Sequence, residues 1–169
     1  HIIEPDLDEI VSEAVSQGYF KASTTPVSAD VFLIVVPTPF KGNHEPDISF
    51  VEAATKSVIP LLKKGDLFVI ESTSPIGTTE KIQKLIYDSR SELEGSIYIA
   101  YCPERVLPGN VMHELIYNDR VIGGVDEIST QRAISFYAKY VKGKLYGTNA
   151  RTAEMCKLVE NSSRDVQIA

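Results

Sequence analysis

Short apolar runs alternate along the chain with longer stretches in which apolar residues recur every three or four positions. Continuous runs rich in β-branched and aromatic residues predict strands that are buried in a sheet. Three such strands are expected at Val31–Val36, Leu67–Ile70 and Ser96–Tyr101. Shorter ones are expected at Arg120–Gly124, Lys144–Tyr146 and near Phe20–Ala22.

The stretches with helical periodicity lie between these strands. Helices are predicted over Pro5–Ser16, Ile48–Leu62, Thr78–Arg90, Glu127–Val141 and from Ala150 to the end of the chain. Asp47 is placed to cap the second helix, and Gly18 and Gly65 follow the ends of the first and second. Strands that alternate with helices predict an α/β fold with a mainly parallel sheet and helices on both faces.

Composition and charge narrow the function classes. The 169 residues carry 17 basic and 23 acidic side chains, a net charge of −6, which argues against general binding to nucleic acid or to an acidic membrane. The longest apolar run, Val31–Val36, is far shorter than the roughly 20 residues of a membrane helix. Two cysteines without a disulfide framework indicate a cytoplasmic protein. The histidines lack metal-ligand spacing, so no metal site is predicted.

Ligands of parallel sheets bind at the carboxyl ends of the strands, which directs attention to three loops. After the first strand, Thr38 stands between two prolines. It either presents its polar groups to a ligand or is simply part of a rigid turn. After the second, the hydroxyl-rich segment 71–79 leads into a helix. Its hydroxyls and helix-start amides suit a phosphate or polar ligand, or serve only to cap the helix.

The third loop, 102–110, places a Glu–Arg pair among prolines and glycine. Glu104 is a candidate acid/base or water-holding group, and Arg105 a candidate bidentate clamp for phosphate or carboxylate. The alternative is a surface ion pair that contributes at most ~1 kcal/mol. Cys102, at the strand end, is either a reactive thiol or a buried, inert one.

The final helix separates into two faces. Apolar and small residues occupy one side, at Met155, Leu158, Val159, Ser162, Val166 and Ala169. Polar residues occupy the other, at Lys157, Glu160, Asn161 and Arg164. Lys157 and Asn161 are four residues apart and meet on one face. This polar stripe is either an ordinary solvated face or a catalytic stripe that stabilises a developing negative charge.

Five segments in this order identify a family resemblance. They are 35–40 (VVPTPF), 71–79 (ESTSPIGTT), 100–109 (AYCPERVLPG), 118–124 (NDRVIGG) and 152–169 (TAEMCKLVENSSRDVQIA). The chain resembles the nucleotide-sugar dehydrogenase family, which includes the enzymes that oxidise UDP-glucose. The resemblance implies a partial Rossmann-like fold that ends in the start of a long central helix. Residues 1–149 would be the C-terminal part of the NAD-binding domain, without its Gly-rich first βαβ unit, and residues 150–169 the start of the dimerisation helix.

The resemblance also implies a reaction. The C6 alcohol of a UDP-sugar would be oxidised to a carboxylate by two NAD⁺ in turn, through a covalent intermediate on a cysteine in a later domain. The cofactor contacts would be Pro37, Thr38, Ser72, Thr73 and Thr79. The catalytic groups would be Lys157, Asn161, Glu104 and Thr73, and the substrate contacts Arg105, Val106, Lys157, Asn161 and Arg164.

The Glu-Arg-Val-Leu-Pro-Gly stretch favours UDP-N-acetyl-D-mannosamine as the sugar, with UDP-N-acetylglucosamine and UDP-glucose as alternatives. A non-catalytic nucleotide-binding module is the alternative from a different class. The resemblance implies a homodimer or higher homo-oligomer. Because the fingerprint and the nucleophilic cysteine of the family are absent from the sequence, which begins at His1, we expect this chain to be an internal piece that cannot turn over substrate alone.

Overall fold

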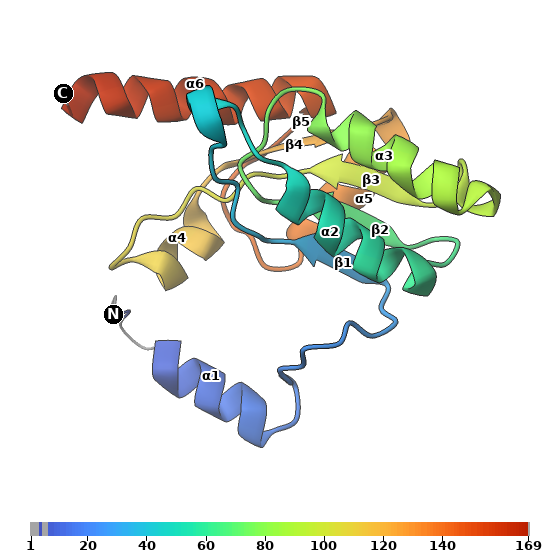
Figure 1. The fold of residues 1–169 in the computed structure, drawn as a ribbon. Coiled ribbons are helices and arrows are strands. Elements are labelled where there is room, and N and C mark those ends of the chain that lie inside the picture. Colours follow the sequence, from blue (N-terminus) through green and yellow to red (C-terminus); the bar gives the residue numbers. More distant parts are fainter. Residues whose placement is uncertain (1–3, 5–6, 169) are drawn as a thin grey trace.

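A five-stranded sheet forms the centre of the computed structural model, which describes residue 4 and residues 7–168 (Figure 1). Its strands are β1 (Val31–Ile34), β2 (Leu67–Ile70), β3 (Tyr98–Tyr101), β4 (Arg120–Gly124) and β5 (Leu145–Asn149), and they lie in that order across the sheet. The first three are parallel, β4 is antiparallel to β3, and β5 is parallel to β4. The prediction of a mainly parallel sheet is confirmed.

Alternating side chains of the central strands supply two hydrophobic cores, one on each face of the sheet. On one face, Phe68 and Ile70 pack with residues of α2 (Ser49–Val58) and α3 (Thr78–Ser89). On the other, Leu67 and Val69 pack with residues of α5 (Glu127–Tyr137). Figure 1 shows these helices on opposite sides of the sheet, which confirms the two-sided α/β architecture.

Three local predictions differ from the structure. No strand forms at 20–22, because no neighbouring strand offers it backbone partners and Phe20 is exposed. Strand β1 ends at Ile34, and among the residues that the structure describes β2 is its one neighbouring strand, so Leu33 and Val35 are exposed rather than buried. Helix α4 (Val111–Tyr117) was not predicted, since seven residues are too few to establish a helical period.

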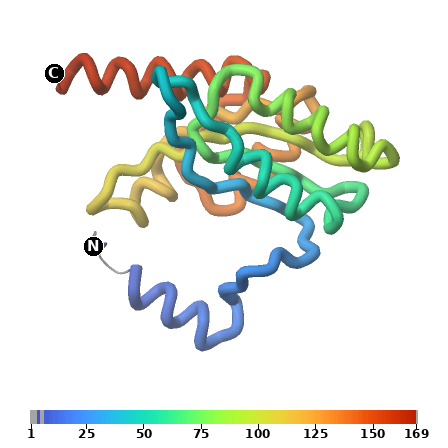
Figure 2. Tube along the Cα trace, viewed as in Figure 1, coloured from blue at the N-terminus to red at the C-terminus, as the bar shows by residue number. Residues whose placement is uncertain are grey.

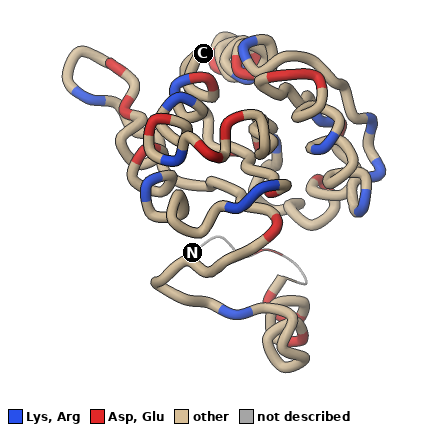
Figure 3. Tube along the Cα trace, turned by 90° about the vertical axis from the view of Figure 1, so that its right-hand side faces the viewer, with Lys and Arg blue, Asp and Glu red and all other residues tan. Residues whose placement is uncertain are grey.

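The first helix, α1 (Leu7–Ser16), forms as predicted within the described residues, and the predicted start at Pro5 lies outside them. It has no buried residue and lies apart from the sheet at the end of an extended connection (Figure 2). Figure 3 shows acidic and basic residues interspersed around the body of the molecule. Within residues 4 and 7–168, no helix is both long and apolar enough to cross a membrane.

Helix α6 (Ala150–Ile168) follows β5 without an intervening loop. Gly123 of β4 makes this junction possible, because a Cβ there would lie 2.2 Å from the Asn149 carbonyl oxygen and 2.8 Å from the Ala150 nitrogen. These neighbouring atoms belong to the backbone, so they cannot rotate away from an added Cβ as a side chain could. The glycine therefore fixes how closely the start of α6 approaches the sheet.

We expect Gly123→Ala to lower the free energy of unfolding by about 2 kcal/mol or more, because an added methyl at a close-packed backbone position forces strain. Urea unfolding followed by circular dichroism measures the change. Gly42→Ala is the matched control, since a Cβ at Gly42 meets nothing within 4 Å and should leave stability unchanged. Equal stability of the two variants would contradict this account of the junction.

Candidate functional site

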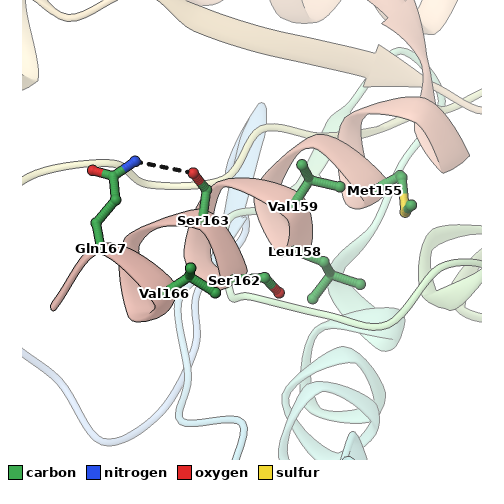
Figure 4. Close-up of a pocket in the computed structure, with 7 residues that line it drawn as sticks. All are labelled: Met155, Leu158, Val159, Ser162, Ser163, Val166 and Gln167. Atoms are coloured by element: carbon green, nitrogen blue, oxygen red, sulfur yellow. Dashed lines mark hydrogen bonds between the residues drawn. The ribbon is translucent and has the colours of Figure 1, made fainter. Parts of the chain in front are cut away.

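Helix α6 turns part of its polar side toward the protein. Its buried residues are Ala150, Ala153, Glu154 and Lys157, which recur at helical spacing on one face. The apolar residues Met155, Val159 and Val166 are exposed, and Figure 4 shows them along the side of the helix that lines an open surface hollow. The interpretation of the stripe as an ordinary solvated face is therefore wrong at Lys157.

Lys157 is the buried cation of this face, with 8% of its surface exposed. Its Nζ donates a hydrogen bond of 2.8 Å to the carbonyl oxygen of Glu104, in the loop after β3. Desolvation lowers the pKa of Lys157, and the nearby charges of Glu160 and Glu104 oppose that shift. An ammonium group in this position can donate a hydrogen bond to an oxygen atom of a ligand that binds next to it.

The loop after β3 is joined to α6 a second time through Arg105. Its Nε and Nη2 donate to the same Glu160 oxygen at 3.0 and 2.7 Å, and its Nη1 donates to the Asp119 carbonyl at 3.3 Å. The Glu104 carboxylate accepts from the Val106 amide within its own loop. Glu104 and Arg105 thus lie next to α6, as a shared site requires. Glu160, a residue of the polar stripe to which the sequence assigned no role, also belongs to this site.

A cavity of about 320 Å³ lies where the loops after β1 and β2 meet α6. Thr38, Thr73 and Asn161, three of the predicted site residues, line it together with Phe40, Ser74 and Asp165, among others. The expectation that the carboxyl ends of neighbouring parallel strands converge is met here, and α6 closes the third side. Hydroxyl, amide and carboxylate groups on a partly apolar wall suit a small ligand that carries polar groups.

Ser72 and Thr79 do not line this cavity, because their hydroxyls are engaged inside the protein. Ser72 Oγ accepts from the Val36 amide at 2.7 Å and lies 2.8 Å from the Val36 carbonyl, so it bridges the two loops. Thr79 is fully buried, and its hydroxyl donates to Glu154 at 2.6 Å. Pro37 and Arg164 are exposed and do not line the cavity.

Sequence reasoning missed Glu154, which is completely buried. Its carboxylate accepts from the Gly77 amide at 2.6 Å and from the Thr79 amide at 2.8 Å, at the start of α3. Of the two alternatives for these helix-start amides, ligand binding or capping, the structure shows the Gly77 and Thr79 amides capped by a carboxylate of the protein itself. The available signal was the position of Glu154 one turn before Lys157, on the same face of the helix.

A second polar cluster lies behind the loops. Tyr137 of α5 donates to the Glu71 carboxylate, and the Arg120 guanidinium lies 5.2 Å from the Tyr137 ring centre. Cys102 beside them is fully buried, and burial raises the pKa of its thiol to about 11. Of the two alternatives for Cys102, the structure favours the inert thiol. Among the described residues, no group of three potential ligands could hold a metal ion.

Comparison with known proteins gives this geometry a context. The profile of the UDP-glucose/GDP-mannose dehydrogenase family, NAD binding domain, matches residues 1–141. The chain is 56% identical to a UDP-N-acetyl-D-mannosamine dehydrogenase of Yersinia pestis and 52% identical to an NDP-N-acetyl-D-galactosaminuronic acid dehydrogenase of Ralstonia solanacearum. Each alignment covers 100% of this chain but 42% of the relative's length.

Among solved structures, the UDP-D-ManNAc dehydrogenase of Pyrococcus horikoshii superposes with a TM-score of 0.94 at 44% identity. That match covers 98% of this chain and 40% of the other. The chain therefore spans less than half of the relatives that it matches, and its fold is theirs over nearly its whole length.

We expect only one cysteine of the native protein to react rapidly with a thiol reagent at pH 8. Cys156 is exposed, whereas Cys102 is buried and its raised pKa keeps it protonated. Titration with Ellman's reagent before and after unfolding counts the two thiols. Cys156→Ser should abolish the rapid phase, and a rapid phase that survives in this variant would contradict the assignment of Cys102 as inert.

Proposed function

The chain belongs to the UDP-glucose/GDP-mannose dehydrogenase family, and from this premise we propose that it is the part of an NAD-dependent UDP-sugar 6-dehydrogenase in which cofactor and sugar meet. One observation carries the proposal. Lys157 is buried on the inner side of α6 and hydrogen-bonds the loop that holds Glu104 and Arg105. A solvated helix face would leave this lysine exposed.

NAD is the cofactor, and the cavity at the carboxyl edge fits one part of it. A volume of about 320 Å³ is at the lower end of ligand pockets, so it accommodates a ring and its neighbours rather than a whole dinucleotide. When bound, NAD⁺ accepts the hydride that leaves C6 of the sugar. Thr38 and Thr73 would hold and orient the cofactor there, and Pro37 would stiffen the loop that presents Thr38. Ser72 and Thr79 would support these contacts from behind.

The substrate side lies along α6 and the loop after β3. The hydroxyl proton of C6 would pass to solvent water as the hydride leaves, and the Lys157 ammonium and the Asn161 amide would donate to the C6 oxygen while it carries negative charge. Glu104 would hold or deprotonate the water of the second, hydrolytic stage, with Thr73 placing that water. Arg105, Val106 and Arg164 would contact the UDP-sugar, and Arg105 would exchange its Glu160 partner for a ligand anion.

UDP-N-acetyl-D-mannosamine is the proposed sugar, converted to UDP-N-acetyl-D-mannosaminuronate. The support is that relatives 54–56% identical over the whole chain are UDP-N-acetyl-D-mannosamine dehydrogenases. UDP-N-acetylglucosamine and UDP-glucose are the alternatives. We also propose that residues 1–149 belong to the NAD-binding domain, that 150–169 begin a central helix, and that the exposed apolar side of that helix contacts a second copy in a homo-oligomer.

The test is NADH formation, followed at 340 nm, by a protein of the relatives' full length that carries this sequence, here called the full-length protein. We expect the highest kcat/KM with UDP-N-acetyl-D-mannosamine and two NADH per sugar oxidised. The 169-residue chain alone should give no NADH. Binding of NAD without oxidation of any of the three sugars would favour the non-catalytic module.

Replacing Lys157 with methionine in the full-length protein should lower kcat about a hundredfold or more, because a donor to a developing oxyanion is removed from a desolvated site. Methionine retains the length and packing of the side chain, so folding should persist. Lys84→Met is the matched control, since Lys84 is exposed and pairs only with Asp88. If kcat of Lys157→Met stayed within threefold of wild type, the catalytic assignment would be lost.

The pH dependence of kcat follows from the same group. Protonated Lys157 is the active form. Desolvation lowers the pKa of Lys157. As pH rises, kcat should therefore begin to fall at a pH lower than about 10.4, the ordinary pKa of lysine. Lys157→Arg, whose guanidinium stays protonated, should lack this alkaline limb in whatever activity remains. A kcat that instead rises through this pH range would show that Lys157 acts as a base.

A further inference from the structure

Helix α3 begins without a cap of its own. Its N-cap residue, Gly77, has a positive φ of 91° and no side chain. The Thr78 amide donates to the Pro75 carbonyl, but no local side chain accepts from the Gly77 and Thr79 amides. Orphan amides at a buried helix start need an acceptor from elsewhere. Glu154 supplies it from α6, 75 to 77 residues along the chain.

The Glu154 carboxylate accepts three hydrogen bonds in this contact. One oxygen accepts from the Gly77 amide at 2.6 Å, and the other accepts from the Thr79 amide at 2.8 Å and the Thr79 hydroxyl at 2.6 Å. The partial positive charge of a helix N-terminus and three charge-assisted hydrogen bonds stabilise the negative charge in a site with no exposure to water. The nearby cation, Arg151, pairs with Glu80 instead.

This contact joins the two halves of the proposed site. Gly77 lies four residues after Thr73, in the same loop, and Glu154 lies one turn before Lys157 and two turns before Asn161 on α6. Within the described part of the chain, Glu154 and Arg151 are the α6 residues whose side chains hydrogen-bond the segment 72–80. The Arg151–Glu80 pair is half-exposed, so it constrains the two elements far less.

We propose that Glu154 is a positioning residue, which fixes the loop carrying Thr73 against the helix carrying Lys157 and Asn161. It touches neither cofactor nor sugar and acts through the loop. Its effect on turnover rests on the function proposed above. Its effect on the loop does not, because the three hydrogen bonds belong to the protein alone.

Glu154→Gln is the sharp test, since it keeps the shape of the side chain but turns one acceptor oxygen into a donor. An NH₂ group cannot accept from Gly77 or Thr79, so at least one amide loses its partner. Arg151→Gln is the matched control, because it removes the other side-chain link between α6 and the start of α3. We expect Glu154→Gln to lower kcat roughly tenfold or more, with both KM values within threefold, because small misplacements of reacting groups cost rate. Arg151→Gln should leave kcat unchanged.

A double-mutant cycle separates positioning from general destabilisation. If Glu154 acts through Thr73, then Glu154→Gln should change kcat less than twofold in a Thr73→Ala background. The same loss in both backgrounds, after correction for the folded fraction, would overturn the proposal. If Glu154→Gln does not fold, Glu154→Asp, which keeps the charge on a shorter side chain, takes its place in the cycle.

Amide hydrogen exchange tests the contact independently of activity. Exchange at Gly77 or Thr79 should accelerate at least tenfold in Glu154→Gln, and the amide of Thr73 should shift in the NMR spectrum. Neither should change in Arg151→Gln. An inactive wild type would remove the proposed function but not this result. Unchanged exchange in Glu154→Gln would overturn the positioning proposal whatever the activity.

Discussion

Glu154 and Lys157 lie one turn apart on α6, and both are buried. Burial of a charged group costs solvation free energy, which well-placed hydrogen-bond partners must offset. Glu154 finds them at the start of α3, and Lys157 finds a carbonyl oxygen in the loop after β3. These two contacts draw loops from β2 and β3 onto one helix. Gly123 lets the start of that helix approach the sheet closely enough for both to form.

The architecture was predictable from the sequence because the central strands are continuous apolar runs and an aspartate marks the start of the helix that follows β1. The Leu67–Ile70 run forms a strand with the predicted bounds, and Asp47 accepts from the Ser49 amide near the start of α2. The edge of the sheet was harder to predict. Val31–Val36 has the composition of a buried strand, but burial depends on a neighbour, and β1 has one only on the β2 side.

The site was predictable to the level of its loops and less so for individual side chains. Thr38 and Thr73 meet at one cavity because the carboxyl ends of neighbouring parallel strands converge, and α6 adds Asn161 to it. Sequence spacing could not tell that α6 directs Lys157 inward, because the helix has an apolar side that would ordinarily be buried. It also could not separate Thr73, which faces the cavity, from Ser72 and Thr79, whose hydroxyls hold the loops together.

The most direct test of the central claim is a crystal structure of the full-length protein with NAD⁺ and an unreactive UDP-sugar analogue bound. The account predicts that the nicotinamide lies in the cavity between Thr38, Thr73 and Asn161, with C6 of the sugar next to the Lys157 ammonium. Glu154 should remain on Gly77 and Thr79. A sugar bound away from α6, with Lys157 still on the Glu104 carbonyl, would contradict it.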